Sequence, residues 1–233
     1  MDATETIADR LERVHRRIAQ AELEYGKPPG SVALLAVSKD VPIEAIHAAA
    51  LSGQHRFGEN YLQESLAKIL DPRLQGLGLE WHFIGPIQSN KISAIAAHFD
   101  WIHSVDRLNI AERLSRQRPV DLSPLNLCLQ VNIDNEPSKS GVTLAQLPAL
   151  AQAVAALPRL RLRGLMAIPA RHDFTEQRVP LRRLRLALEA LQAGGLKLDT
   201  LSMGMTDDLE AAIAEGATIV RVGRGVFGVR GEG

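Results

Sequence analysis

The sequence contains a single cysteine, no net charge and no apolar run long enough to cross a membrane. The cysteine, Cys128, lies inside the apolar run 125–131, so we expect a core position and exclude a disulfide framework. Lysine and arginine total 27 residues, as do aspartate and glutamate. Because these charges balance, no overall field favours nucleic acid or a membrane surface as the partner. The lack of a long apolar run argues against a helix that spans a bilayer.

The N-terminus also lacks the features of a signal peptide, because residues 1–5 carry two acidic side chains and no apolar stretch follows them. Apolar side chains instead recur at helical spacing, at Ile7, Leu11, Val14 and Ile18. We therefore expect an amphipathic N-terminal helix within residues 1–25 and a soluble, cytoplasmic protein.

Beyond this helix, strand-like and helix-like segments alternate along the chain. The expected strands are 32–37, 55–58, 81–84, 101–105, 125–133, 162–168, 198–202 and 218–222. The expected helices between them are 42–52, 61–70, 89–98, 107–117, 144–157, 174–192 and 207–215. Such alternation predicts a parallel α/β fold, and eight strands suit a TIM (β/α)8 barrel, with a doubly wound sheet as the alternative. No linker divides the chain, so we expect one domain with the barrel over residues 32–228.

Lys39 follows the apolar run 32–37, with only Ser38 between them. A run of this composition, bounded by turn residues, is typical of a strand buried on both faces. Desolvation at the edge of a core disfavours the ammonium form, so part of the amine is expected to be neutral and nucleophilic. The chemistry that suits such an amine is a Schiff base with a carbonyl. The alternative is a surface lysine just beyond a strand.

Two glycine turns follow the last two expected strands. Gly223, Gly225 and Gly228 follow residues 218–222, and exposed backbone N–H groups in such a turn can hold an anion. Gly204 lies in a similar turn, with Thr206 or Asp207 as a helix cap. In a TIM barrel these turns and Lys39 would meet at the C-terminal mouth, where phosphate often binds. The alternative is that the glycines serve only the backbone angles of the turns.

Other motifs exclude several kinds of site. His82 and His103 lie within expected strands, where a hydrogen-bonded core histidine is the favoured interpretation. No HExxH or paired-cysteine pattern supports a metal site, and no GxSxG elbow or P-loop is present. Arg159, Arg161 and Arg163 form a basic group without aromatic neighbours, which indicates a solvated face and no contact with nucleic acid.

Seven stretches of sequence together point to a known family. They are LLAVSK at 34–39, RFGENY at 56–61, WHFIGPIQSNK at 81–91, SKSG at 138–141, RGLMAI at 163–168, LSMGMTDD at 201–208 and RVG at 221–223. This pattern resembles the pyridoxal phosphate homeostasis proteins over residues 32–227, and the stretch at 81–91 is long and specific.

The resemblance implies a fold-type III barrel like the N-terminal domain of alanine racemase, binding pyridoxal 5′-phosphate but without the C-terminal β domain of the racemase. Lys39 matches the lysine that forms the Schiff base with the cofactor. Arg221 matches the arginine that faces the pyridine nitrogen, and Asn60 matches a residue near the ring. Lys91 and Lys139 remain open as transient second sites.

The resemblance also implies a phosphate site, and here the chain departs from the family. Gly223 and Arg224 match the phosphate-binding turn, with Ser202 from the preceding strand. The family usually has Ser or Thr where this chain has Arg224, so a hydroxyl donor is lost, and the guanidinium can replace it only if it folds inward. After Lys39 the family often has Thr and then Lys, where this chain has Asp40 and Val41.

These features favour a carrier over an enzyme. A permanently charged Arg221 beside the ring nitrogen would disfavour the protonated ring on which racemases depend. Racemases of this type also take a second base, a tyrosine, from their β domain, whereas the chain ends about ten residues after its last expected strand and its only tyrosines are Tyr25 and Tyr61.

We therefore predict a monomeric, cytoplasmic carrier of pyridoxal phosphate with cofactor-free enzymes as recipients, and with no nucleic-acid or membrane partner. The alternatives are an amino-acid racemase-like pyridoxal enzyme and a barrel enzyme acting on a phosphorylated metabolite without pyridoxal.

Overall fold

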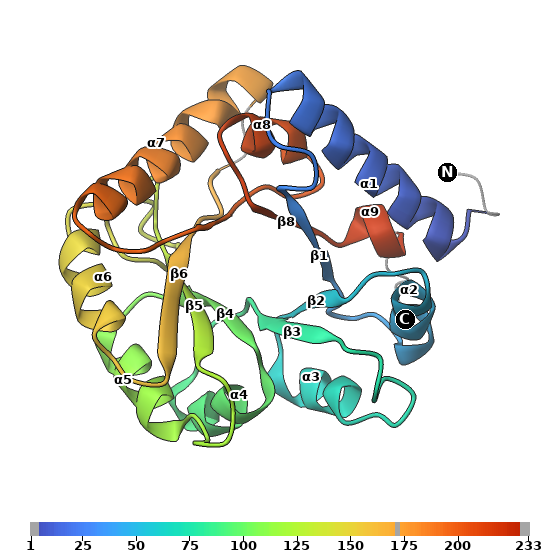
Figure 1. The fold of residues 1–233 in the computed structure, drawn as a ribbon, viewed down its shortest axis with the longest axis horizontal. Coiled ribbons are helices and arrows are strands. Elements are labelled where there is room, and N and C mark those ends of the chain that lie inside the picture. Colours follow the sequence, from blue (N-terminus) through green and yellow to red (C-terminus); the bar gives the residue numbers. More distant parts are fainter. Residues whose placement is uncertain (1–4, 171–172, 229–233) are drawn as a thin grey trace.

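The computed structural model describes residues 5–170 and 173–228, which form a closed barrel of eight parallel strands (Figure 1). The strands are β1 (Ala33–Val37), β2 (Arg56–Glu59), β3 (Glu80–Phe83), β4 (Trp101–Val105), β5 (Leu125–Gln130), β6 (Leu160–Met166), β7 (Thr200–Ser202) and β8 (Ile219–Val222). Neighbours in sequence are neighbours in the sheet, and β1 closes the barrel against β8 with Leu34 beside Val220. The predicted TIM barrel is confirmed, and closure excludes the doubly wound sheet.

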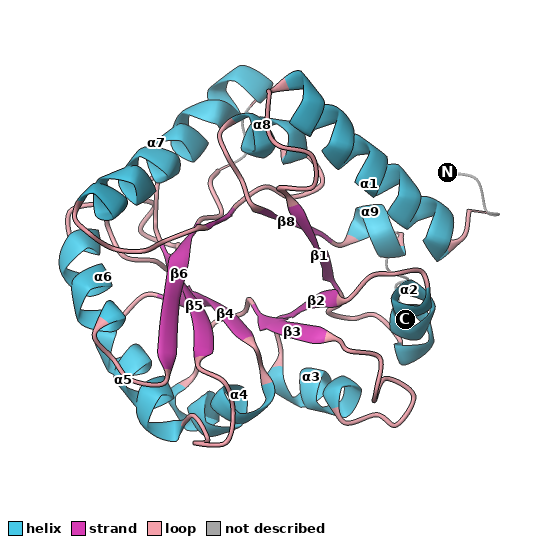
Figure 2. Ribbon diagram, viewed as in Figure 1, coloured by secondary structure: helices cyan, strands magenta, loops and turns pink. Residues whose placement is uncertain are grey.

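Helices surround the barrel on the outside (Figure 2). They are α1 (Ile7–Glu24), α2 (Ile43–Leu51), α3 (Leu62–Ile69), α4 (Ile92–His98), α5 (Leu108–Gln117), α6 (Leu147–Ala155), α7 (Phe174–Ala193), α8 (Leu209–Ala214) and α9 (Arg224–Phe227), with a 3-10 turn η1 (Ser89–Lys91) before α4. A glycine turn was predicted after the last strand, where the structure has the short helix α9. None of the helices within the described ranges is long and apolar enough to cross a membrane.

The strand β5 ends at Gln130, three residues earlier than expected. The reason is the side chain of Asn132, whose Nδ2 donates to the carbonyl oxygens of Glu136 (2.8 Å) and Lys139 (3.1 Å). An asparagine that bonds backbone groups in its own loop competes with strand pairing. The chain therefore turns into a loop that borders the mouth of the barrel.

The N-terminal helix α1 is confirmed and packs against α8 and α9. Thr6 begins it with a capping box to Asp9, which satisfies backbone donors of the first turn. On its inner side Arg17 pairs with Glu210 of α8 (2.9 Å) and donates to the carbonyl of Thr206 (3.0 Å). Helix α1 therefore braces the loop after β7 from the outside.

The inside of the barrel contains polar side chains. TIM barrels usually fill this space with branched aliphatic residues. Here His82, His103 and Ser202 have no exposed surface, and Arg221 is 5% exposed. Cys128 is buried as expected, and burial raises the pKa of its thiol to about 12. The polar interior is the feature of this fold that most directly shapes the site described next.

Candidate functional site

A cavity of about 370 Å3 lies at the C-terminal ends of the strands. Five of the six residues predicted for the cofactor line it: Lys39, Asn60, Arg221, Gly223 and Arg224. Its other lining residues are Val37, Ile84, Met166, Ile168, Met205, Thr206 and Asp207. A concave, mostly apolar space with a few converging polar groups is typical of a site for a small molecule or cofactor. Barrel closure thus brings residues from both ends of the chain to one mouth.

Lys39 follows β1 and is half-buried at this mouth. Its neighbour Ser38 is held on two sides, because its hydroxyl donates to Glu59 Oε1 (2.5 Å) and its carbonyl accepts from Lys68 Nζ (2.6 Å). Lys68 also pairs with Glu59 (2.8 Å). The peptide that carries the Lys39 side chain is therefore tied to buried charges behind β1 and β2.

The residue after Lys39 is fixed as well. Asp40 has a left-handed backbone (φ 57°), and its N–H donates to Glu64 Oε1 (2.6 Å). Glu64 in turn pairs with Lys68, four residues later on α3. We call Ser38, Glu59, Glu64 and Lys68 the Lys68 cluster. It holds the backbone on both sides of Lys39.

Glu59 is the most buried charge of this cluster, with no exposed surface. Burial raises the pKa of its carboxyl, and the nearby Lys68 ammonium only partly offsets this. The ionised form of the Glu59 carboxyl therefore depends on the Lys68 ammonium, since an unpaired buried charge is costly.

Arg221 lies on β8, the strand that pairs with β1, and also lines the cavity. Its Nη1 donates to Ser202 Oγ (2.7 Å) and its Nη2 donates to the carbonyl of Ala167 (2.9 Å). Burial lowers the pKa of the guanidinium to about 10, so it remains charged at neutral pH. These bonds use two of its five N–H groups.

Ser202 is the one predicted residue that does not line the cavity. Its side chain is fully buried beneath Arg221, and its hydroxyl lies 2.7 Å from both Arg221 Nη1 and His103 Nδ1. Thr206, four residues later in the chain, lines the cavity instead. The sequence predicted Thr206 or Asp207 as a helix cap, which is wrong because α8 begins after Asp208. A hydroxyl in the loop after a strand was the signal that could have identified Thr206 as a lining residue.

The turn after β7 depends on a glycine. Gly204 has φ +91°, and a Cβ there would lie 2.5 Å from Ala212 Cβ. No other residue fits this close approach of loop to α8 without displacement. After β8, Gly223 precedes α9, whose first backbone N–H groups have no acceptor inside the helix. These groups stand beside the cavity as donors for an anion.

Arg224 lies at the rim. Its side chain is 60% exposed and its Nη2 lies 3.4 Å from Asp207 Oδ2. A pair this long and this exposed contributes little to stability. The guanidinium therefore stands at the edge of the cavity, with the carboxylate of Asp207 beside it.

The donors and acceptors of the cavity suit pyridoxal phosphate. Lys39 offers a primary amine, and the Gly223 turn with Thr206 offers donors to an anion. Asn60 Oδ1 is buried and has no hydrogen-bond partner among the described residues, so it is an acceptor open to a ligand. Gly85 allows this arrangement, since a Cβ there would lie 2.2 Å from the carbonyl oxygen of Asn60.

A second cavity of about 360 Å3 adjoins the first and shares Asn60, Ile84 and Ile168 with it. Lys139 lines this second cavity, with its Nζ 2.5 Å from Glu136 and 3.3 Å from the carbonyl of Ile168. Lys91, at the end of η1, lines neither cavity. Of the two additional lysines, the structure brings only Lys139 near the site.

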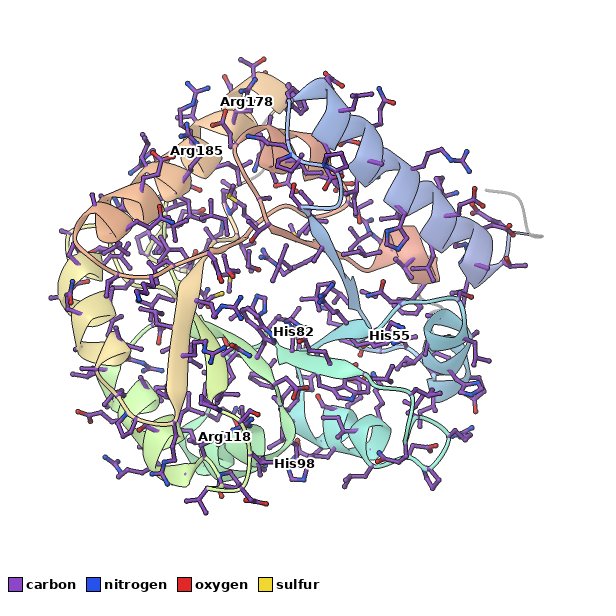
Figure 3. The ribbon with its side chains drawn as sticks, in the orientation of Figure 1. His55, His82, His98, Arg118, Arg178 and Arg185 are labelled. Atoms are coloured by element: carbon purple, nitrogen blue, oxygen red, sulfur yellow. The ribbon has the colours of Figure 1, made fainter. Side chains whose placement is uncertain are left out.

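His82 and His103 are core histidines, as expected. Both are fully buried and hydrogen-bonded, with His82 Nδ1 2.8 Å from His103 Nε2. Figure 3 shows His82 inside the ring of strands, whereas Arg178 and Arg185 lie on α7 outside it. Burial lowers the pKa of both imidazoles, so both are neutral at pH 7.

Comparison with known proteins agrees with this geometry. The family described as "Alanine racemase, N-terminal domain" matches residues 10–231. A pyridoxal phosphate homeostasis protein of Pseudomonas aeruginosa is 56% identical over 229 residues, which cover 98% of this chain and 97% of that protein.

Among solved structures, PipY of Synechococcus elongatus with pyridoxal phosphate bound has a TM-score of 0.84 at 40% identity, covering 96% of this chain and all of PipY (100%). Alanine racemase from Corynebacterium glutamicum shares the fold, with a TM-score of 0.69 at 19% identity, covering 96% of this chain and 60% of the racemase. Because relatives at 40–56% identity match nearly the whole chain and share its barrel, this chain belongs to the pyridoxal phosphate homeostasis protein family.

Proposed function

We infer that this protein holds pyridoxal 5′-phosphate reversibly on Lys39 and serves cytoplasmic cofactor supply as a carrier. The observation that carries the proposal is the meeting of Lys39, Arg221 and the Gly223 turn in one cavity. Pyridoxal phosphate supplies an aldehyde that a primary amine captures reversibly, together with a dianionic phosphate. PipY, whose structure holds this cofactor, matches the whole barrel.

Each side chain has a part in holding the cofactor. The Lys68 cluster fixes the backbone of Lys39 on both sides, so the amine is presented at a constant place. The Gly223 turn and Thr206 offer donors to phosphate. Arg221, with two N–H groups fixed by Ser202 and Ala167, presents a rigid positive charge to the ring.

The same residues favour a carrier over a racemase. A charged guanidinium beside the ring nitrogen disfavours protonation of that nitrogen, and an unprotonated ring withdraws electrons weakly. Neither tyrosine of the chain, Tyr25 or Tyr61, lines the cavity. We propose a monomer that gives up its cofactor to cofactor-free enzymes, which light scattering and transfer to such an enzyme would test.

The test of the site is the substitution Lys39→Ala. Wild-type protein incubated with pyridoxal phosphate is expected to show a visible absorption band, and borohydride reduction should add the cofactor mass to the peptide that contains Lys39. Lys39→Ala should lose both signals. Lys91→Ala is the matched control, because Lys91 lies outside both cavities, and it should keep them.

An unchanged band in Lys39→Ala would refute Lys39 as the anchor. Cofactor mass on the peptide that contains Lys139 after borohydride reduction would then place the cofactor in the second cavity. The racemase alternative predicts sustained exchange of the α-proton of an amino acid in deuterated water, dependent on Lys39. Such exchange at an enzymatic rate would overturn the carrier proposal.

A further inference from the structure

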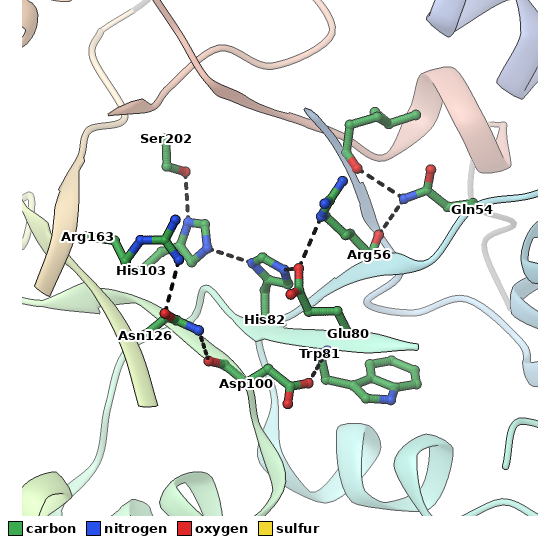
Figure 4. Close-up of polar contacts among 11 residues, drawn as sticks. Gln54, Arg56, Glu80, Trp81, His82, Asp100, His103, Asn126, Arg163 and Ser202 are labelled. Carbon is green, nitrogen blue, oxygen red and sulfur yellow. Dashed lines mark hydrogen bonds and ion pairs between the residues drawn. The ribbon is translucent and has the colours of Figure 1, made fainter. Parts of the chain in front are cut away.

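A continuous chain of hydrogen bonds runs through the barrel from the cavity to its other end. Arg221 Nη1 lies 2.7 Å from Ser202 Oγ, which lies 2.7 Å from His103 Nδ1. His103 Nε2 lies 2.8 Å from His82 Nδ1, and His82 Nε2 lies 2.8 Å from Glu80 Oε1. Figure 4 shows the part of this chain from Ser202 to Glu80. We call Ser202, His103, His82 and Glu80 the histidine relay.

The two ends of the relay determine where every proton lies. The guanidinium of Arg221 only donates. At the other end, the hydrogen bond from His82 lowers the pKa of Glu80 to about 2, so its carboxylate only accepts. Both histidines are neutral, because burial lowers the pKa of each.

One arrangement satisfies every contact under these conditions. Glu80 requires a proton on His82 Nε2, so His82 Nδ1 accepts from a proton on His103 Nε2. His103 Nδ1 then accepts from the Ser202 hydroxyl, which leaves the Ser202 oxygen to accept from Arg221. Each neutral imidazole has one donor and one acceptor nitrogen, so the tautomer of one histidine dictates that of the next.

The relay is also held in place by packing. His82 stacks on Trp101, with ring centroids 5.4 Å apart and planes inclined by 6°. The guanidinium of Arg163 covers Trp101 at 4.7 Å from the ring centroid. His82, His103 and Ser202 have no exposed surface, so rotation of either ring would break buried hydrogen bonds.

The far end of the relay lies at the N-terminal end of the barrel. There Glu80 pairs with Arg56 (3.1 Å), and both side chains line a cavity of about 590 Å3. The two residues are partly exposed, at 37% for Glu80 and 50% for Arg56. A solvent-accessible carboxylate is thus connected to the cofactor cavity through neutral groups alone.

We propose that the histidine relay is a set of positioning residues that fixes the Arg221 guanidinium toward the cofactor cavity from the opposite end of the barrel. The role of Arg221 toward the cofactor rests on the proposed function; the relay itself does not. A glutamine in place of Glu80 has an amide N–H that can donate to His82 Nε2. Every hydrogen bond of the relay can then reverse its direction. His103 would then donate to Ser202, whose oxygen would face two donors while its own proton had no acceptor.

The substitution Glu80→Gln tests this proposal without changing a residue that lines the cofactor cavity. In wild-type protein at pH 7, nitrogen-15 NMR of the imidazoles should show both His82 and His103 protonated at Nε2 alone. In Glu80→Gln, both histidines should show a second tautomer, and the side-chain N–H groups of Arg221 should exchange faster with solvent. Glu44→Gln is the matched control, since Glu44 is an exposed carboxylate paired with Arg73 outside the barrel.

The second measurement is cofactor binding. Glu80→Gln should weaken the affinity for pyridoxal phosphate about three- to tenfold, the range expected for one hydrogen bond, and shift the visible band. Glu44→Gln should change neither. His103→Asn, which shortens the relay in its middle, should give the same two effects with equal or greater size.

Three results would overturn the proposal. They are a proton on His103 Nδ1 in the wild-type protein, an unchanged exchange rate of Arg221 in Glu80→Gln, and an unchanged affinity and band in both relay variants. Wild-type protein with the expected tautomers and slow Arg221 exchange but no visible band would contradict the proposed function and still support the relay.

Discussion

Two polar networks support neighbouring parts of the cavity wall, one built mainly of charged side chains and the other mainly of neutral ones. The Lys68 cluster behind Lys39 is built mainly of charged side chains, with Glu59 fully buried and Lys68 5% exposed at its side chain. The histidine relay behind Arg221 uses neutral groups between two charged ends. A buried ion pair fails when one partner is removed, whereas a neutral histidine chain fails when it takes up protons. The same cavity is therefore sensitive to two different perturbations.

The largest expected effect is on the charged side. Lys68→Met keeps an apolar stem but leaves Glu59 buried without its cation, so the free energy of unfolding should fall by about 3–5 kcal/mol. Urea unfolding at pH 7 measures this loss. The double variant Lys68→Met with Glu59→Gln should recover part of it, because no buried charge remains unpaired. A loss below about 1 kcal/mol for the single variant would show that the cluster is not a buried ion pair.

For the histidine relay we expect the free energy of unfolding to depend on pH. Burial lowers the pKa of His82 and His103 below the ordinary value of 6.5, so these histidines bind protons more readily when the chain is unfolded. Their contribution to stability is present above pH 6.5 and is lost as the pH falls below it. Between pH 7 and 5.5 the two together should remove at most about 2.5 kcal/mol from the free energy of unfolding, the limit for two groups with an ordinary pKa of 6.5.

Urea unfolding at a series of pH values measures this slope. His103→Asn removes one of the two groups, so its stability should depend less steeply on pH over the same range. An equal slope in the variant would mean that other groups cause the loss. Lys68→Met should flatten the slope by a different route, because without the ammonium the pKa of Glu59 rises further and the folded protein binds a proton there as the pH falls. The double variant Lys68→Met with Glu59→Gln should lose this effect, which separates the two networks.

The smallest effect is expected at the rim, where neither network reaches. Arg224→Thr restores the hydroxyl usual in the family and removes an exposed pair with Asp207. The free energy of unfolding should change by less than about 0.5 kcal/mol. Titration with pyridoxal phosphate and with pyridoxal would show whether the guanidinium contributes to phosphate binding. The quantity compared is the affinity for pyridoxal phosphate divided by the affinity for pyridoxal. If this ratio is lower in Arg224→Thr than in the wild-type protein, the guanidinium contributes to phosphate binding. If the ratio is higher, the threonine hydroxyl is the better donor.

Most of the architecture followed from the local pattern of the chain. Alternating apolar strands and amphipathic helices are sufficient to predict a parallel barrel, and barrel closure then places the ends of β1 and β8 together. The sequence alone therefore predicted Lys39 and Gly223 at one mouth of the barrel. The misplaced end of β5 and the missed helix α9 both involve side chains or backbone groups that bond within short loops, which leave no periodic signal.

The direction of individual side chains did not follow from the sequence. Strands of a parallel barrel are buried on both faces, so their apolar runs do not reveal which residues point inward. Ser202 was expected at the phosphate, but β7 pairs it with Met166 and Ile219, and in that register its hydroxyl lies under Arg221. The sequence also left open whether Arg224 folds inward, and the structure places it at the rim beside Asp207, a residue from another loop.

The sequence by itself determined the barrel, the lysine at its mouth and the family, because these depend on local periodicity and on contiguous motifs. Only the tertiary structure decided the two networks. Glu59 meets Lys68 across β2 and α3, and His82 meets His103 and Ser202 across three strands, at separations set by the register of the closed sheet. The order of hydrogen bonds from Arg221 to Glu80 exists because the closed barrel brings side chains of four strands, β3, β4, β7 and β8, into contact in its interior.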